Sequence, residues 1–178
     1  MKYQQLEKNI KDAIIEQQLK LGYVKETVGL YYPANSIKNI LECKKANLEE
    51  LDKALEQFSD YVESRYGKIE VSRKKDRYCI KVPPTGSEYI HQNMGNVDFL
   101  KKLIEAVKSH DCTMEKISNL FHEFSDDIIE EKMKDEDFDH MICFVDKNID
   151  EYYYCFKEEG CHLIYHRFLE ADYKELIG

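Results

Sequence analysis

The residues with the clearest potential for binding form a short basic run in the first half of the chain, Ser72-Arg73-Lys74-Lys75-Asp76-Arg77. Segments that alternate apolar and polar residues flank this run on both sides, which predicts a β-hairpin with the run at its turn. The side chains expected to contact phosphate groups or a partner are Arg73, Lys74, Lys75 and Arg77. The alternative is that these charges only protect an edge strand from pairing with another chain.

A second cluster combines cysteine and histidine, two residue types that bind zinc. Its members are Cys155, Cys161, His162 and His166. His162 and His166 share one face of a predicted strand but lie about 13 Å apart, at about 3.3 Å per residue. Ligands of one zinc ion each lie about 2 Å from it, so this pair cannot share an ion. The spacing therefore predicts no metal site.

Candidates for catalysis are equally weak. Cys79 and His91 could act as a nucleophile and a base, but no neighbouring pattern supplies an orienting group or an oxyanion site. The chain has no glycine-rich phosphate loop and no G-x-S-x-G or H-E-x-x-H motif. The acidic run at residues 123–139 lacks the spacing of a calcium-binding loop. We therefore expect a protein that is not an enzyme and needs no cofactor.

Aromatic residues are concentrated near the C-terminus. Alternation along residues 151–157 places Tyr152, Tyr154 and Phe156 on one face of a strand and Tyr153 on the other. Aromatic side chains on both faces exceed what one small core can cover, so these residues are candidates for an aromatic protein interface. The alternative is that they reflect β-propensity and core packing.

The overall composition is that of a globular protein. The chain has 178 residues, of which 43% are hydrophobic and 34% charged, and its formal net charge is −9. This acidic balance disfavours non-specific binding to nucleic acid. No apolar run is long enough to span a membrane, and the N-terminal segment lacks the apolar middle of a signal peptide, so we expect a cytoplasmic protein. In that reducing compartment the six cysteines are expected to be free thiols.

The elements that would position these residues follow from periodicity and capping signals. Asn47 and Glu50 form a capping-box pattern, and Gly67 is a typical helix stop. A helix is therefore predicted from the residue after Asn47 to about Tyr66. The other predicted helices cover residues 2–20, 36–45, 97–109, 113–132 and 170–177. A short strand is expected within residues 24–33, two strands flank the basic run within residues 69–82, and three lie at 141–146, 151–157 and 161–168.

Residues 36–60 and 102–126 align without a gap and share an amphipathic helix pattern that ends in Phe-Ser-Asp. Predicted strands follow each copy, which suggests that one structural unit occurs twice. The alternative is that any two amphipathic helices can be aligned in this way. In the first half, the order helix, short strand, helix, helix and β-hairpin is that of a winged helix.

We therefore predict an α+β fold of tandem winged-helix-like units, each with two helices and a β-hairpin, and a three-stranded antiparallel meander at the C-terminus. The first unit is expected to span residues 1–86, and the second, packed on the first, residues 87–178. Pro83-Pro84-Thr85-Gly86 would be the linker between them. The exposed face of the helix at residues 48–65 is acidic, which opposes contact with a phosphate backbone.

Three stretches, residues 21–33, 77–91 and 152–168, resemble an uncharacterised bacterial family known only as a domain of unknown function. This resemblance covers nearly the whole chain and implies no activity. A looser similarity, carried by the acidic helix ELDKALEQFSDYVESRYG followed by IEVSRKKDRYCIKV, is to the tandem winged-helix accessory subunits of bacterial chromosome-condensing complexes. It implies an acidic, duplicated, adaptor-like protein.

The predicted function is that of a non-enzymatic protein-interaction or adaptor module with a protein partner. The alternative is a DNA-binding regulator that contacts phosphates through the basic hairpin at residues 72–77. No membrane partner is expected, and the sequence leaves the oligomeric state open.

Overall fold

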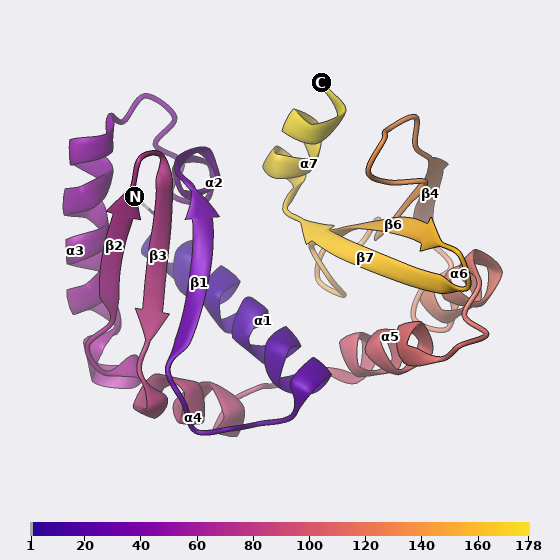
Figure 1. The fold of residues 1–178 in the computed structure, drawn as a ribbon, viewed down its shortest axis with the longest axis horizontal. Coiled ribbons are helices and arrows are strands. Elements are labelled where there is room, and N and C mark those ends of the chain that lie inside the picture. The colour runs from indigo at the N-terminus through magenta and orange to yellow at the C-terminus, as the bar shows by residue number, and fades with distance from the viewer. Residues whose placement is uncertain (1) are drawn as a thin grey trace. The chain divides into compact units, whose positions relative to one another are not determined.

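Two antiparallel sheets, each with its own helices, make up residues 2–178, the part of the chain that the computed structural model describes (Figure 1). Seven helices accompany the two sheets in these residues, so the predicted α+β class is confirmed. The chain divides into two compact units after Asn96, rather than after residue 86. The second unit covers Val97–Gly178.

The first unit contains the three-stranded sheet. Its elements are α1 (Tyr3–Leu21), β1 (Val28–Pro33), α2 (Ala34–Ile40), α3 (Leu48–Tyr66), β2 (Glu70–Lys74), β3 (Arg77–Val82) and α4 (Pro84–Gln92). The strand order β1-β3-β2 places β3 in the centre, with both neighbours antiparallel to it. Up to β3, the order of helices and strands is the one that the sequence predicts.

Local signals explain both ends of α3. The Asn47 side chain accepts a hydrogen bond from the backbone N–H of Glu50 at 2.9 Å, and the Glu50 carboxylate accepts one from the backbone N–H of Asn47 at 2.8 Å. This capping box satisfies two donors that the first turn of a helix leaves without partners. Gly67 follows the last turn with a φ of 74°, a conformation that glycine adopts without strain.

The segment predicted as a linker instead begins α4, which packs against α1 and α3. Pro84 is the first residue of this helix, a position that proline favours because its missing N–H costs no hydrogen bond there. Gly86 lies so close to α3 that a Cβ atom on it would be 2.7 Å from the carbonyl oxygen of Tyr66. The Pro-Pro-Thr-Gly sequence is therefore part of the packed first unit.

The helices of the first unit cover one face of its sheet. On the central strand, Tyr78, Ile80 and Val82 point into the core and are at most 1% exposed. Residues of α1 and α3 that complete this core are Leu6, Ile10, Ile14, Leu51, Leu55, Phe58 and Val62. Figure 1 shows α1 behind the sheet, while the other face of the three strands is turned toward the viewer.

The second unit contains a sheet with the order β4-β5-β6-β7, in which each strand pairs with the next along the chain. Its elements are α5 (Asp98–Lys108), α6 (Met114–His122), β4 (Ile128–Lys132), β5 (His140–Phe144), β6 (Tyr153–Glu159), β7 (His162–Phe168) and α7 (Glu170–Ile177). The predicted C-terminal meander is therefore present, with four strands in place of three.

The additional strand corrects the predicted helix at residues 113–132, because α6 ends at His122 and residues 128–132 form β4. Ile128 lies opposite Phe144 and Ile129 opposite Cys143 on the neighbouring strand. β-branched residues such as isoleucine fit this pleated surface well. The helical periodicity of the sequence continues past His122, but pairing with β5 decides the conformation.

Two small cores lie on the two faces of the second sheet. On one face, aromatic and aliphatic residues of α5 and α6 pack on the strands; this core includes Phe99, Leu103, Phe121, Phe144, Tyr154 and Phe156. On the other face, α7 and the segment that leads into β5 cover a second core, which includes Phe138, Met141, Cys143, Cys155 and Tyr173. Both faces of this sheet are therefore covered over its central strands, whereas Ile129 on the edge strand β4, on the same face as Cys143, is 41% exposed.

Each unit contains two consecutive helices followed by antiparallel strands, as the sequence repeat suggests. The units differ in strand number, in strand order and in the length of the second helix, which has 19 residues in α3 and 9 in α6. The aligned Phe-Ser-Asp motif lies inside α3 but beyond the end of α6. Among residues 2–178, no helix combines the length and apolar character needed to cross a membrane.

Candidate functional site

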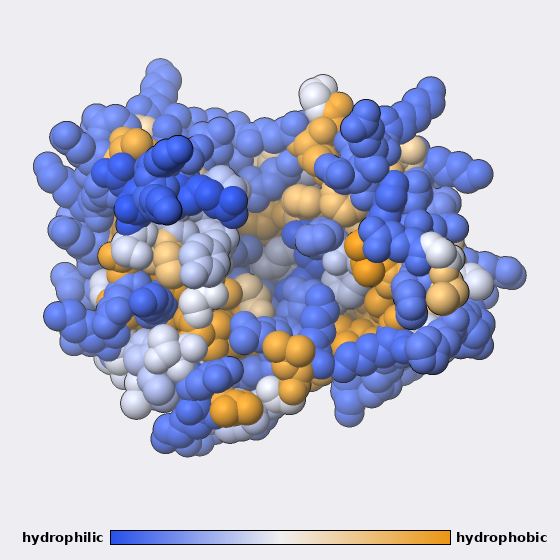
Figure 2. All heavy atoms as spheres, in the orientation of Figure 1, coloured by the Kyte–Doolittle hydropathy of each residue, from blue (hydrophilic) through white to orange (hydrophobic). Residues whose placement is uncertain are grey.

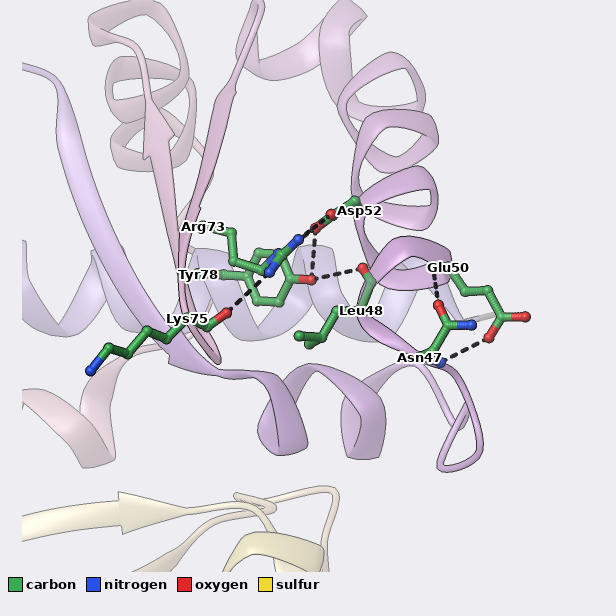
Figure 3. Close-up of polar contacts among 7 residues, drawn as sticks. All are labelled: Asn47, Leu48, Glu50, Asp52, Arg73, Lys75 and Tyr78. Atoms are coloured by element: carbon green, nitrogen blue, oxygen red, sulfur yellow. Dashed lines mark hydrogen bonds and ion pairs between the residues drawn. The ribbon is translucent and has the colours of Figure 1, made fainter.

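One member of the predicted basic cluster, Arg73, is hydrogen-bonded to helix α3 of its own unit (Figure 3). Its guanidinium donates two hydrogen bonds to the Asp52 carboxylate on α3, at 2.9 and 2.8 Å. The Tyr78 hydroxyl donates to the same carboxylate at 2.8 Å. Figure 3 shows Arg73 directed toward α3, whereas the side chain of Lys75 at the turn points away. Arg73 therefore anchors the hairpin to the helix.

The charges of this anchor stabilise one another. The hydrogen bonds from Arg73, with a smaller contribution from Tyr78, lower the pKa of Asp52 below its ordinary value of 3.8. Burial and the hydrogen bond to Asp52 raise the pKa of the Tyr78 hydroxyl, so it remains a donor. Because the guanidinium of Arg73 already donates to Asp52, it is less available to bind a ligand than an unpaired cation is.

The other basic residues of β2 and β3 lie on the exposed side of the first sheet, which we call the open face. The residues of this face that line its groove are Tyr31, Ser72, Lys74, Arg77, Cys79 and Lys81, and Arg73 and Tyr78 also border the groove. Glu70 lies on the same face, opposite Lys81. The strand register explains this grouping, since Tyr31 and Ser72 are both opposite Cys79. Side chains two residues apart on a strand share a face, so Arg77 and Lys81 lie on the two sides of Cys79 along β3.

The open face is a shallow groove of about 460 Å³ with a basic lining and one prominent ring. Tyr31 is 70% exposed. Within residues 2–178, the side chains of Lys74, Arg77 and Lys81 have no ion pair or hydrogen bond. Figure 2 shows this side of the first unit, with strongly hydrophilic residues at the β2–β3 turn and paler or hydrophobic ones farther along the strands. The groove can therefore bind an anion beside an apolar group.

The predicted cluster is thus divided by the structure. Lys74 and Arg77 are part of the open face, Lys75 lies at the turn with a φ of 57°, and Arg73 is held by α3. Lys81 and Tyr31 were not among the residues predicted from the sequence. Strict alternation from Arg77 would have identified Lys81, whereas Tyr31 could be placed only once β1 was known to pair with β3.

The exposed side of α3 carries the opposite charge. Its exposed acidic residues are Glu49, Glu50, Glu56, Asp60 and Glu63, against one exposed lysine, Lys53. In helix-turn-helix proteins, the second helix enters the major groove of DNA between phosphate backbones. An acidic α3 is repelled by those phosphates, so the basic groove of the open face is the better candidate site.

The structure corrects the predicted aromatic interface. Tyr154 and Phe156 are fully buried and Tyr152 is 5% exposed, all three in the core beneath α5 and α6. Tyr153 points to the other face, where its ring stacks on that of Tyr173 in α7 at 4.7 Å. These residues stabilise the second unit and leave no exposed aromatic surface on β6.

The cysteine and histidine candidates are dispersed. His91 stacks on Tyr23 with ring centroids 3.9 Å apart, while Cys79 lies half-buried on the open face. His162 is near His110, at 5.8 Å between the ring centroids. Among residues 2–178, no group of three or more His, Cys, Asp or Glu side chains has the arrangement of a metal site. All six cysteines fall within these residues and are free thiols.

A second depression, of about 690 Å³, lies at the connection from α2 to α3 and is lined by residues that include Cys43, Lys44 and Lys45. The start of α3 would favour an anion here, since helix N-termini carry partial positive charge. However, the Asn47–Glu50 capping box already uses donors of this turn, and the carboxylate of Glu50 borders the depression. The open face is therefore the stronger site.

Comparison with known families agrees with the resemblance expected from the sequence. A family model described as "Domain of unknown function, E. rectale Gene description (DUF3877)" matches residues 3–177. The chain belongs to this family. No curated protein and no solved structure matches the chain. The looser similarity to chromosome-condensation subunits thus remains an expectation from sequence pattern.

Proposed function

We propose that the chain is a non-enzymatic binding module that holds an acidic segment of a protein partner on the open face of its first unit. The observation that carries this proposal is the groove lined by Lys74, Arg77 and Lys81 beside the exposed ring of Tyr31. Cations next to an exposed aromatic ring suit a ligand that offers carboxylates beside apolar side chains.

The spacing of the cations favours an extended ligand. Arg77 and Lys81 are four residues apart on β3, which separates them by about 13 Å along the strand. An extended peptide places its own residues i and i+4 at the same separation. A segment with acidic residues at i and i+4 and an apolar residue at i+2 therefore matches the open face, with the apolar side chain near Tyr31 and Cys79.

The order of elements in the first unit supports a winged-helix-like module, and the β2–β3 hairpin corresponds to its wing. The alternative function is that of a DNA-binding regulator in which Lys74, Lys75 and Arg77 contact phosphates. The acidic surface of α3 favours the protein ligand, because phosphates would approach Glu49 and Glu56 if α3 entered a groove.

A direct test measures binding of a fluorescent acidic peptide to the full chain, with Glu at positions i and i+4 and Ile at i+2. The variant Lys74→Glu/Arg77→Glu/Lys81→Glu is expected to bind it at least about tenfold more weakly, since each reversal replaces an attraction with a repulsion. The matched control Lys44→Glu/Lys53→Glu/Lys68→Glu changes charge equally elsewhere on the unit and should bind like the unaltered chain.

Two further probes make the result decisive. A peptide with Lys in place of Glu should not bind, and a short DNA duplex should bind no better to the unaltered chain than to the reversed variant. Binding of DNA through Lys74, Lys75 and Arg77, without binding of the acidic peptide, would establish the alternative function. Absence of binding to both probes would contradict both.

A further inference from the structure

The second unit carries an exposed acidic strand with the pattern that the open face requires. Asp127 precedes β4, and its carbonyl oxygen accepts a hydrogen bond from Val145, so the extended pairing of β4 includes it. Asp127, Ile129 and Glu131 alternate along this strand and point to the same side. All three are exposed, with Ile129 at 41%. We call these three residues the acidic strand.

The carboxylates of the acidic strand are available to a binding partner. Within residues 2–178, the carboxylates of Asp127 and Glu131 take part in no ion pair or hydrogen bond. β4 is an edge strand, paired only with β5, so nothing in its own sheet lies beyond it. Charges on an edge strand can simply prevent aggregation. That role does not require the acidic residues to alternate with an exposed isoleucine.

We propose that the open face of one copy of the chain binds the acidic strand of a second copy. Asp127 and Glu131 are about 13 Å apart, the same separation as Arg77 and Lys81. Ile129 then lies opposite the surface formed by Tyr31 and Cys79. This inference rests on the proposed function and names its ligand, because the acidic segment belongs to another copy of the same protein.

The contact joins an apolar centre to charges of opposite sign, the arrangement typical of specific interfaces. The net charge of −9 on each chain opposes association at long range. At physiological ionic strength, however, exposed charges are screened beyond about 8 Å. The overall repulsion is therefore weakened beyond that distance, and the contact depends on the local complementarity between the two surfaces.

Two charge-reversed variants of the full chain test this contact by sedimentation equilibrium. Variant A is Arg77→Glu/Lys81→Glu, and variant B is Asp127→Lys/Glu131→Lys. The unaltered chain is expected to self-associate, and each variant alone should do so at least about tenfold more weakly, because like charges then face each other. An equimolar mixture of A and B restores opposite charges at every contact and should recover association.

The control Asp126→Lys/Glu130→Lys makes the same charge change at exposed positions beside the acidic strand, one before β4 and one within it, and should associate like the unaltered chain. Its Glu130 change also removes the hydrogen bond from Ser118, so its folding is checked by circular dichroism. If circular dichroism shows that either double variant does not fold, the single variants Arg77→Glu and Asp127→Lys are used in place of the double ones. A mixture of A and B that stays monomeric, or an unaltered chain that is monomeric at high micromolar concentration, overturns the inference. If the acidic peptide still binds the open face in that case, the proposed function stands and only the second copy is excluded as ligand; if the peptide also fails, both are wrong.

Discussion

The two sheets of this protein differ in how many of their faces are covered. In the first unit, helices cover one face of β1-β3-β2, and the other face stays open with Tyr31 70% exposed. In the second unit, α5 and α6 cover one face of β4-β5-β6-β7, and α7 with the segment before β5 covers the other. A covered sheet contributes stability, whereas an open face with unpaired charges is available to bind.

The same comparison explains why tyrosine side chains on the two sheets differ in exposure. Tyr31 and Tyr153 both lie on strands and are of the same type, but Tyr153 stacks on Tyr173 and Tyr31 has no helix above it. The difference arises from α7, which has no counterpart on the open face of the first sheet. We therefore expect the binding site on the sheet face that no helix of its unit covers.

The largest expected difference is in cysteine alkylation. Cys79 is half-buried on the open face, whereas Cys155 is fully buried on the covered face of a central strand, where burial raises the pKa of its thiol to about 12. Iodoacetamide should modify Cys155 about a hundredfold or more slowly than Cys79, since reaction requires the second unit to open. Peptide mass spectrometry over time measures both rates, and exposed Cys161 serves as the fast reference. Equal rates for Cys79 and Cys155 in the folded chain would contradict the comparison.

Phe121→Ala should cause the largest loss of stability. The Phe121 ring is fully buried and contacts the rings of Phe99, Phe144 and Tyr154. Removing it is expected to cost about 3–5 kcal/mol, as for other fully buried phenylalanines. Hydrogen exchange measured strand by strand should show faster exchange in β4 to β7 and unchanged exchange in β1 to β3. Faster exchange in both sheets would show that the units do not unfold separately.

Tyr173→Ala removes part of the cover that distinguishes the second sheet from the first. Tyr173 is 6% exposed and stacks on Tyr153, so we expect a loss of about 2–4 kcal/mol in the free energy of unfolding from urea denaturation. The matched change Tyr31→Ala on the open face should alter stability by no more than about 0.5 kcal/mol, because exposed side chains contribute little. Similar effects of the two changes would mean that α7 does not set the sheets apart.

Asp52→Asn should have a small effect that depends on pH. The pKa of Asp52 is lower in the folded chain than its ordinary value of 3.8, so its carboxylate stabilises the fold above that pH. The contribution disappears as pH falls through the folded pKa. We expect the variant to lower the thermal midpoint at neutral pH by about 2–4 °C, and the difference from the unaltered chain to vanish at lower pH. The reverse trend, with a larger difference in acid, would exclude the Arg73–Asp52 pair as its cause.

Sequence patterns predicted the elements with strong local signals. The capping box at Asn47 and the stop at Gly67 bound α3 as expected, and the C-terminal helix covers Glu170–Ile177 as predicted. The patterns failed where partners far along the chain decided the outcome. Residues 128–132 have helical periodicity but pair with β5, and Pro84 begins a helix because α1 and α3 supply a surface for it. No local signal reports such partners.

The candidate site was predicted in part. A basic hairpin was expected and is present, but the sequence could not separate Arg73, which faces Asp52, from Arg77, which faces solvent. That separation depends on the strand register and on the position of α3. The aromatic interface was placed on the wrong residues for a related reason, because the burial of Tyr152 to Phe156 depends on α5, α6 and α7.

The sequence by itself determined the composition, the net charge, the positions of most helices and strands, and the family to which the chain belongs. These properties follow from residue types and from spacings of a few positions. Only the tertiary structure decided which sheet faces are covered, and so which side chains are free to bind. Coverage depends on contacts between segments many residues apart. A strand with apolar residues on both faces can be covered by helices of its own unit or by a partner, and its own sequence does not distinguish the two.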